Sequence, residues 1–284
     1  MSESEADNLA NLIEAAVFHL DDEEQNPKAL TGWAAVSRLQ RFADTETLSA
    51  AIALTQNPDT RRRRVGAAIL GQLDHDIEAP DGVFRNERYC ALERLVQDEI
   101  GHGEDPEVLG DALVAMGHLN DSRVLSIAGS LIAHASATVR FGVVSALSKH
   151  DEEAAINGLI QLSSDCDEEV RDWATFGLGQ LIEADTPAIR AALHARLDDL
   201  CAQILGEAIE GLATRGDQSV LPILIRELHD GVSLPLLDAA TALATPDLCE
   251  ALVAARKLGL VIEASHGPFD LSNEWTEAMH ACGC

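Results

Sequence analysis

A helical repeat constrains this chain more than any other feature of its sequence. The tetrapeptide Leu-Gly-Gln-Leu occurs twice, at residues 70–73 and 178–181, and aligning the two copies brings Arg62 level with Val170. Extending the alignment finds seven copies, separated by 31, 46, 31, 31, 34 and 31 residues. Their first positions, called anchors below, are Thr31, Arg62, Val108, Val139, Val170, Ile204 and Pro235. A repeat of this length is typical of solenoids, in which each unit packs only on its neighbours.

Each copy has a small or medium-sized residue four positions after the anchor and a large apolar residue eight positions after it. This spacing puts both on one stripe of an α-helix. The small residue lets two helices approach, and the large one fills the layer between them. The residues four positions on are Ala35, Gly66, Ala112, Val143, Ala174, Ala208 and Ala239. The residues eight positions on are Leu39, Leu70, Met116, Leu147, Leu178, Leu212 and Leu243.

A second apolar helix is expected between successive anchor helices, with residues 186–197 and 219–228 as clear examples. A capping residue followed by proline is typical of a helix start, and it occurs at Thr186-Pro187, Thr245-Pro246 and Asp105-Pro106. Three glycines fall near predicted helix ends, where a left-handed residue is favoured: Gly71, Gly117 and Gly179.

The pattern therefore predicts an all-α fold, a right-handed α-α superhelix of about seven helical pairs. We expect a capping helix in residues 1–27 and the solenoid in residues 28–260. The step of 46 predicts an insertion near residues 74–88. Residues 261–284 break the pattern, and we expect an irregular segment and a short helix there. No convincing alternating strand pattern occurs in the sequence.

The motifs at residues 167–181 (DEEVRDWATFGLGQL) and 137–147 (ATVRFGVVSAL) resemble HEAT repeats of the phycobilisome-lyase type. Their usual form is an acidic turn, then Val-Arg, a small residue and Ala-Leu. The resemblance covers about residues 28–257 and implies a HEAT-like α-solenoid. The Val-Arg pair itself survives only in the copies that begin at Val139 and Val170.

The run Arg61 to Arg64 stands out against 48 acidic and 20 basic residues. Consecutive arginines are often a nucleic-acid patch, but Arg63 occupies the arginine slot of the resemblance. In HEAT-like arrays that arginine commonly pairs with an aspartate of the preceding turn, which implies partners at Asp59 and, for Arg171, at Asp167. We therefore expect a structural run, with Arg64 as its best candidate for contact with a partner.

A net charge of −28 opposes binding to nucleic acid and to anionic membranes, and it favours a basic partner. The sequence has no long apolar stretch and no basic segment before its first apolar residues. We therefore expect a cytoplasmic monomer. Four of the six cysteines are scattered, and we expect inert thiols rather than a disulfide framework from them: Cys90, Cys166, Cys201 and Cys249.

Catalytic and metal-binding motifs are weak in this sequence. None of the ten histidines is followed by glutamate, which argues against the di-iron centre of HEAT-like deoxyhypusine hydroxylases. Residues 73–81 and 98–107 combine histidine with carboxylates, a pattern more typical of solvated turns. The end of the chain offers His280, Cys282 and Cys284, and there we favour a mobile tail with reactive thiols over a metal site, which needs four ligands. We expect no catalytic residues, metal or cofactor.

Surface positions then become the candidate site. Positions two and six after each anchor oppose the buried stripe, and position three lies on its flank. The candidate partner-binding residues are Trp33, Arg64, Phe141, Asp172, Trp173, Phe176, Glu207 and Glu210. The aromatic members are either interaction hot spots or residues buried between repeats by the curvature of the solenoid.

These observations favour a non-enzymatic scaffold that binds a basic partner protein through an acidic and aromatic groove. Residues 61–73 and 170–181 are also similar to HEAT-repeat proteins associated with Rhs-type polymorphic toxins of bacteria, which are regarded as immunity proteins. The alternative implied by the repeat type is a bilin lyase, or a lyase-like chaperone for a tetrapyrrole-carrying protein.

Overall fold

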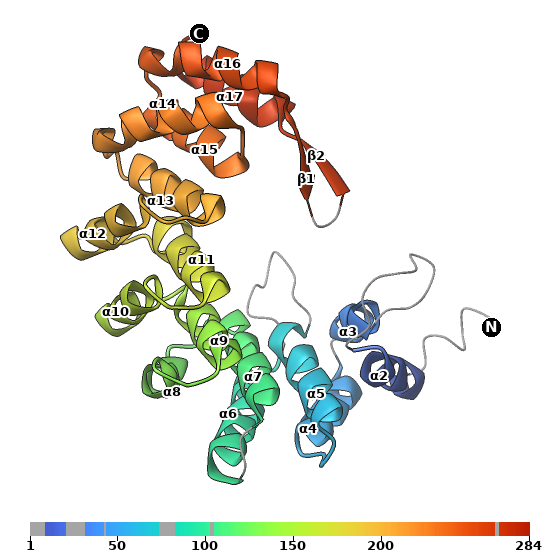
Figure 1. The fold of residues 1–284 in the computed structure, drawn as a ribbon. Helices are drawn as coiled ribbons and strands as arrows, with labels where there is room; N and C mark the ends of the chain where they lie inside the picture. Colours follow the sequence, from blue (N-terminus) through green and yellow to red (C-terminus); the bar gives the residue numbers. More distant parts are fainter. Residues whose placement is uncertain (1–8, 21–31, 43, 74–82, 103–104, 265–266) are drawn as a thin grey trace, which may run out of the picture. The chain divides into compact units, whose positions relative to one another are not determined.

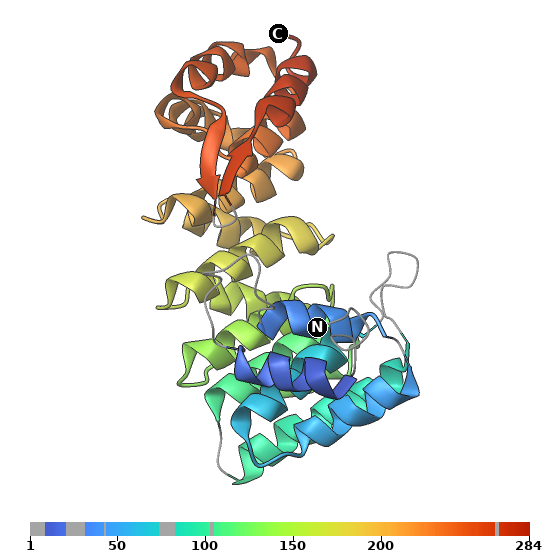
Figure 2. The ribbon, with the colours of Figure 1, turned by 90° about the vertical axis from the view of Figure 1, so that its right-hand side faces the viewer.

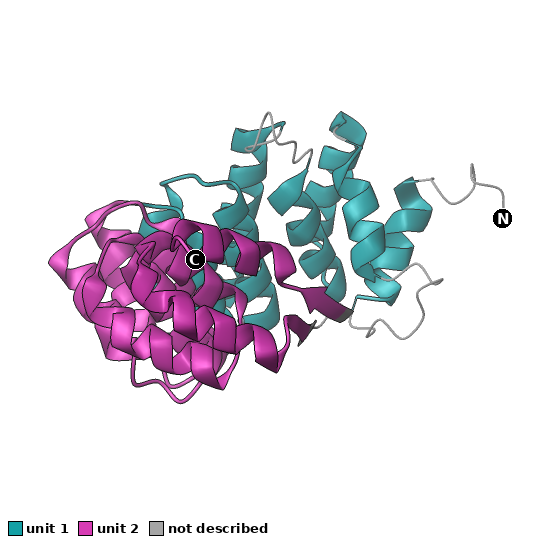
Figure 3. Ribbon diagram, turned by 90° about the horizontal axis from the view of Figure 1, so that it is seen from above, with its two compact units in different colours: residues 1–150 teal, residues 151–284 magenta. Residues whose placement is uncertain are grey.

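The chain divides into two compact units, residues 1–150 (unit 1) and 151–284 (unit 2) (Figure 3). The computed structural model describes residues 9–20, 32–42, 44–73, 83–102, 105–264 and 267–284. Within these residues, the one exception to the helical fold is a short hairpin in unit 2. The all-α solenoid expected from the repeat is confirmed.

Unit 1 builds two layers of helices. Its helices are α2 (Leu9–Phe18), α3 (Gly32–Gln40), α4 (Thr45–Thr55), α5 (Thr60–Gln72), α6 (Arg85–His102), α7 (Pro106–His118), α8 (Val124–Leu131) and α9 (Ala137–Leu147). The anchor-bearing helices α3, α5, α7 and α9 pack side by side and form what we call the anchor layer (Figure 1). Helices α4, α6 and α8 form the second layer, and α2 packs on α3 and α5.

Unit 2 repeats this arrangement. Its helices are α10 (Glu153–Leu162), α11 (Glu168–Phe176), the π-helix η1 (Gly177–Leu181), α12 (Pro187–Arg196), α13 (Ala202–Thr214), the short η2 (Gln218–Val220), α14 (Leu221–Asp230), α15 (Leu234–Leu243), the short η3 (Pro246–Leu248), α16 (Cys249–Leu258) and α17 (Ser272–Ala281). Helices α11, α13 and α15 form the anchor layer, which α17 extends by packing on α15 (Figure 1). Helices α10, α12, α14 and α16 form the second layer.

The buried stripe predicted from the repeat is confirmed in both units. The described residues four and eight positions after each anchor are all buried. The anchors from Val108 onward are buried as well, whereas Arg62 is part-exposed and Thr31 lies outside the described residues. Packing between the helices therefore follows the small-then-large pattern of the sequence.

The predicted helix starts are also confirmed. The Asp105 carboxylate accepts a hydrogen bond from the backbone N–H of Val108 at 3.4 Å. The Thr186 hydroxyl accepts one from the N–H of Ile189 at 3.3 Å. Thr245 caps the short helix η3 in the same way. Each of these side chains satisfies a backbone donor that the first turn of a helix leaves free.

The expected left-handed conformation of Gly71, Gly117 and Gly179 is wrong. The described glycines with positive φ are Gly216, Gly259 and Gly283. Close approach between neighbouring helices explains the small residues instead. A Cβ atom on Gly71 would lie 3.0 Å from the Cα of Ala115, and one on Gly211 would lie 2.6 Å from the Cα of Gly179.

The arginine of the Val-Arg slot does not pair with the aspartate of the preceding turn. Asp59 and Asp167 cap their helices instead, accepting hydrogen bonds from the N–H of Arg61 at 2.9 Å and of Val170 at 3.1 Å. This corrects the pairing implied by the resemblance. A carboxylate at a helix N-terminus is stabilised by the free N–H groups and the helix dipole.

The arginine in the second position of the Val-Arg pair instead donates hydrogen bonds to backbone carbonyls of the preceding turn. Two of these arginines, Arg63 and Arg171, also pair with an acid from a later helix or turn. Arg63, Arg140 and Arg171 each donate to two carbonyl groups of that turn. Arg63 also lies 2.8 Å from a Glu99 carboxylate oxygen, and Arg171 lies 3.1 Å from one of Asp199. The arginine at this repeat position thus links successive elements of the solenoid.

The other arginines of the run have structural contacts too. Arg62 donates two hydrogen bonds to Glu14, at 2.9 and 2.8 Å, which ties α5 to α2. Arg64 Nε lies 2.7 Å from Asp111, which ties α5 to α7. The structural role expected for the run is confirmed for Arg62, Arg63 and Arg64.

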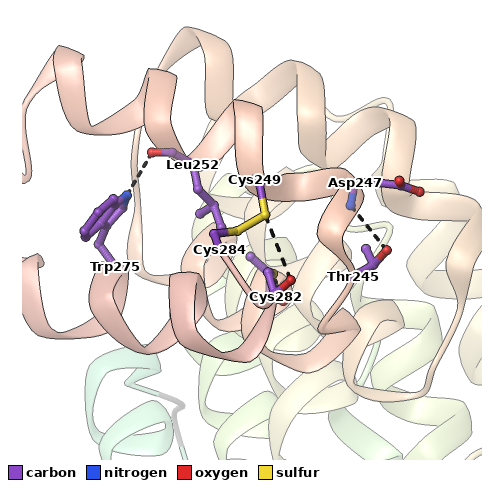
Figure 4. Close-up of a disulfide and its surroundings, with 8 residues drawn as sticks. Thr245, Asp247, Cys249, Leu252, Trp275, Cys282 and Cys284 are labelled. Atoms are coloured by element: carbon purple, nitrogen blue, oxygen red, sulfur yellow. Dashed lines mark hydrogen bonds between the residues drawn. A yellow bond between two sulfur atoms is a disulfide. The ribbon is translucent and has the colours of Figure 1, made fainter.

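The C-terminal segment is a folded cap, and the expectation of a mobile tail with reactive thiols is wrong. Cys284 forms a disulfide with Cys249 at the start of α16 (Figure 4), so the expectation of an inert thiol is wrong for Cys249 as well. Cys282 is buried and its thiol lies 3.5 Å from the carbonyl oxygen of Ala240. The indole of Trp275 donates to the carbonyl of Leu252 at 2.8 Å (Figure 4). Helix α17 is therefore held to α15 and α16 by covalent and packing contacts.

A two-stranded antiparallel hairpin joins α16 to α17. Its strands are β1 (Val261–Ala264) and β2 (Gly267–Asp270), with Val261 opposite Asp270 and Ile262 opposite Phe269. The hairpin extends beyond the ends of the helices it joins (Figures 1 and 2). These strands were not predicted, because they are four residues long and β2 contains Gly267 and Pro268, residue types that are uncommon inside strands.

Candidate partner-binding surface

The candidate residues differ in exposure. Trp33 and Trp173 expose 51% and 46% of their surface, whereas Glu207 exposes only 5%. The other members of the set, Arg64, Phe141, Asp172, Phe176 and Glu210, are half-buried. Of the two readings of the aromatic residues, exposure therefore applies to the tryptophans and partial burial to the phenylalanines.

In unit 1, polar side chains of neighbouring anchor-layer helices pair with one another. Arg64 of α5 is engaged by Asp111 of α7, and a second carboxylate oxygen, from Glu107, lies 3.8 Å away. The side-chain amide of Gln72 lies 3.2 Å from the ring of His118. Trp33 borders a hollow of about 80 Å³ beside these groups. The positive charge of Arg64 is therefore already paired with the Asp111 carboxylate, which weakens Arg64 as a contact for a partner.

In unit 2, the anchor layer presents a group of carboxylates that we call the acidic face: Asp172 of α11, Glu207 and Glu210 of α13, and Asp238 of α15. The carboxylate of Glu207 accepts one hydrogen bond, from the amide of Gln203 at 2.7 Å. Its other oxygen is buried without a hydrogen-bond partner, as is one oxygen of Asp172. Buried polar atoms without partners are rare in folded proteins and call for an explanation.

The electrostatics of the acidic face favour the neutral carboxyl form. Burial, reinforced by the neighbouring charge of Asp172, raises the pKa of Glu207 to about 7. Burial and the charge of Glu207 raise the pKa of Glu210 to about 8. Burial also raises the pKa values of Asp172 and Asp238. Desolvation and like charges both penalise ionisation, so the whole face holds protons more tightly than exposed carboxyls do.

The arginines of unit 2 are engaged away from the acidic face. Arg171 and Arg196 pair with Asp199, Arg190 with Asp185 and Asp217, and Arg226 with Glu227. Arg215 donates to backbone carbonyls of the η1 segment, and Arg256 lies over the ring of Trp275. Among the described residues, none of the identified ion pairs includes a carboxylate of the acidic face.

An aromatic pair borders the acidic face. Trp173 and Phe176 of α11 stack edge to face, with their ring centroids 5.7 Å apart. Trp173 immediately follows Asp172 in the sequence. The pair offers partly exposed aromatic area on the helix that carries Asp172.

Sequence reasoning missed Asp238 and its neighbour Glu274 of α17. One oxygen of Glu274 is buried without a hydrogen-bond partner, and the charge of Glu274 helps to raise the pKa of Asp238. A signal for Asp238 was present, because Asp111, Glu207 and Asp238 all stand three positions after their anchors. Glu274 lies beyond the seven copies of the repeat, so the alignment could not find it.

The described residues contain no group of three or more His, Cys, Asp or Glu side chains arranged to hold a metal ion. His280, Cys282 and Cys284 therefore do not form such a group. Of the two histidine-containing segments, residues 74–82 and 103–104 lie outside the described residues, and residues 98–102 form the end of α6. None of the described helices is long and apolar enough to cross a membrane.

Comparison with known proteins agrees with this architecture. The family profile for HEAT repeats matches residues 93–179 and 156–244, which together span just over half of the chain. The chain belongs to the HEAT-repeat family. Its arrangement of anchor and second layers is therefore that of a family whose repeats generally serve as protein-interaction scaffolds.

A solved structure shares the fold. The X-ray structure of YibA from Escherichia coli superimposes with a TM-score of 0.62 over 100% of this chain and 97% of YibA, at 22% sequence identity. This similarity supports the helical-repeat fold. No curated protein sequence matches the chain.

Proposed function

We propose that this HEAT-repeat protein is a non-enzymatic scaffold that binds a basic segment of another protein on the acidic face of unit 2. The observation that carries the proposal is Glu207, a carboxyl group that is 5% exposed, has an oxygen without a partner, and adjoins other carboxyls with no identified cation. A buried acid without a counter-ion destabilises the folded chain. A cationic partner would supply the missing charge.

The surroundings of Glu207 indicate what that partner offers. Asp172 lies on the preceding helix of the anchor layer and Asp238 on the following one, so arginine or lysine side chains spaced along a segment would each meet a carboxylate. Trp173 and Phe176 would contact apolar side chains of the same segment. Electrostatic attraction would speed the encounter, and the aromatic contact would prolong the complex.

Within this proposal, we favour the narrower role of an immunity protein that neutralises a basic toxin. It is supported by the similarity of residues 61–73 and 170–181 to repeat proteins associated with Rhs-type toxins, and by the net charge of −28. The bilin-lyase alternative rests on the repeat type alone. The unpaired carboxylates favour the scaffold role, because a basic partner explains them and a tetrapyrrole bearing propionates does not.

The direct test is binding of a short fluorescein-labelled peptide rich in arginine and leucine, followed by fluorescence anisotropy. The variant Glu207→Gln/Glu210→Gln removes two carboxyl groups, which a bound cation would hold ionised, from the acidic face. We expect it to bind the peptide at least about tenfold more weakly, as for loss of a desolvated charge contact.

The matched control removes two charges elsewhere on unit 2. Glu153 of α10 and Glu250 of α16 are exposed and belong to the second layer. The variant Glu153→Gln/Glu250→Gln should change the affinity less than about twofold, because exposed charges act weakly. Equal losses in both variants would show that only the net charge of the protein attracts the peptide, and the proposal would be wrong.

A further inference from the structure

The carboxyl groups of the acidic face hold protons, and a cationic partner that binds there would compete with them. Glu207 and Glu210 lie three residues apart on α13. The charge of Glu207 acts on Glu210, and the charge of Asp238 of α15 acts on both. Burial and these like charges disfavour ionisation of both carboxyls when no cation is near. In the free protein, protons are the available positive charges.

We propose that binding at the acidic face is proton-coupled: cationic side chains of the basic partner displace protons held by Glu207 and Glu210, so that complex formation releases protons and tightens as the pH rises. This inference rests on the proposed function, because it concerns the same face and the same class of partner. It adds a regulatory property, sensitivity of the complex to pH near neutrality.

The groups identified as acting on the pair come from α11, α13 and α15. On α11, Asp172 faces Glu207, and on α13 itself the contacting group is the neutral amide of Gln203. On α15, Asp238 faces both glutamates. All of these neighbours are acidic or neutral, so none of them stabilises an ionised carboxylate by its charge.

The charges that act in turn on Asp238 and Asp172 are also negative. Glu274 and Glu277 of α17 act on Asp238, and Glu168, Glu169 and Asp199 act on Asp172. Arg171 adjoins Asp172 in the sequence, but its guanidinium lies 3.1 Å from Asp199. The unpartnered oxygen of Glu207 is itself buried, so a bound guanidinium would contact the half-buried Glu210 and act on Glu207 through its charge.

Isothermal titration calorimetry measures the proton release directly. The arginine-rich peptide would be titrated into the full-length protein at pH 7 in phosphate and in Tris, buffers whose ionisation enthalpies differ. Arginine stays charged throughout this range, so the peptide itself contributes no protons. We expect release of about one proton per peptide bound, and affinity that rises about tenfold between pH 6 and pH 8.

The variants distinguish this inference from the proposed function. Glu207→Gln and Glu210→Gln should each reduce the number of protons released, whereas Glu153→Gln/Glu250→Gln should leave it unchanged. Peptide binding that depends on the acidic face but has the same enthalpy in both buffers would overturn the proton coupling and leave the proposed function standing. Absence of peptide binding to the wild-type protein would overturn both.

Discussion

The two units use one repeat position in opposite ways. Three residues after its anchor, unit 1 has Asp111, and Arg64 of the preceding anchor helix pairs with it at 2.7 Å. At the same position unit 2 has Glu207 and Asp238, and neither has an identified basic partner among the described residues. In unit 2 the place equivalent to Arg64 holds Asp172, two positions after the anchor Val170.

The two units share their buried core but differ in the charges beside it. Both units bury the same stripe of small and large residues, so the core does not depend on the charges beside it. The pair between Arg64 and Asp111 in unit 1 shows that an arginine of the preceding anchor helix can neutralise the acid at this repeat position. The acidic face of unit 2 therefore lacks such pairing although the fold does not require this. Local loss of protein stability of this kind is typical of binding surfaces.

The largest expected effect tests whether the units share their core. Leu70 of unit 1 and Leu178 of unit 2 stand at the same repeat position and are fully buried. Leu70→Asp and Leu178→Asp should each lower the free energy of unfolding by about 5 kcal/mol, because each buries an unpaired charge. Urea unfolding followed by circular dichroism measures this. A loss below about 1 kcal/mol in either variant would show that the two positions are not equivalent.

The disulfide should distinguish unit 2 from unit 1. Cys249 and Cys284 are separated by 35 residues, and closing such a loop stabilises the folded state by about 4 kcal/mol. Reduction, or Cys284→Ser, should lower the melting temperature of the transition that includes α16 and α17. Thiol titration of the unfolded protein without reductant is the control. It should find four free thiols, and six would show that the disulfide does not form.

The acidic face should make unit 2 less stable as the pH rises. Glu207 binds its proton more tightly in the folded chain, with a pKa of about 7, than in the unfolded chain, with a pKa of about 4.5. The folded state therefore holds more protons between these values, and the free energy of unfolding falls as the pH rises through them, by about 3 kcal/mol for this group. Below pH 4.5 this penalty is absent.

Urea unfolding at a series of pH values between 5 and 8 measures this slope. Glu207→Gln removes the titrating group and should flatten the slope, whereas Glu153→Gln should leave it unchanged. A wild-type slope that Glu207→Gln does not alter would show that Glu207 is solvated or paired in the folded protein.

The smallest expected effect exchanges the charge pattern of the two units. Asp172→Arg recreates in unit 2 the pair that Arg64 makes in unit 1, and it should raise the free energy of unfolding by about 1 kcal/mol while abolishing binding of the basic peptide. Arg64→Ala leaves the half-buried Asp111 without that partner and should lower the free energy of unfolding by about 2 kcal/mol. Differential scanning calorimetry and peptide anisotropy measure both properties. A destabilised Asp172→Arg protein would break the proposed equivalence of the two positions.

The repeat made the fold predictable. The spacing of residues such as Ala174 and Leu178 identifies the buried side of a helix from local periodicity alone. The caps at Asp105 and Thr186 were equally local. The partners of Arg63 and Arg171 were not, because Glu99 and Asp199 come from the following elements, 36 and 28 residues later along the chain.

The candidate surface was only partly predictable for the same reason. Position in the repeat pointed to Asp172, Glu207 and Glu210, but the charge state of these groups depends on neighbours contributed by adjacent helices. The disulfide between Cys249 and Cys284 could not be inferred, since six cysteines allow many pairings. It depends on α17 packing against α16, a contact that lies beyond the last recognisable repeat.

The most direct test of the central claim is the pH titration of the Glu207 and Glu210 side-chain carboxyl carbons by NMR, with and without the arginine-rich peptide. We expect pKa values of about 7 and about 8 in the free protein, and a fall of both when the peptide binds. Values near that of an exposed glutamate in the free protein, or values that the bound peptide leaves unchanged, would contradict the claim that the acidic face of unit 2 awaits a cationic partner.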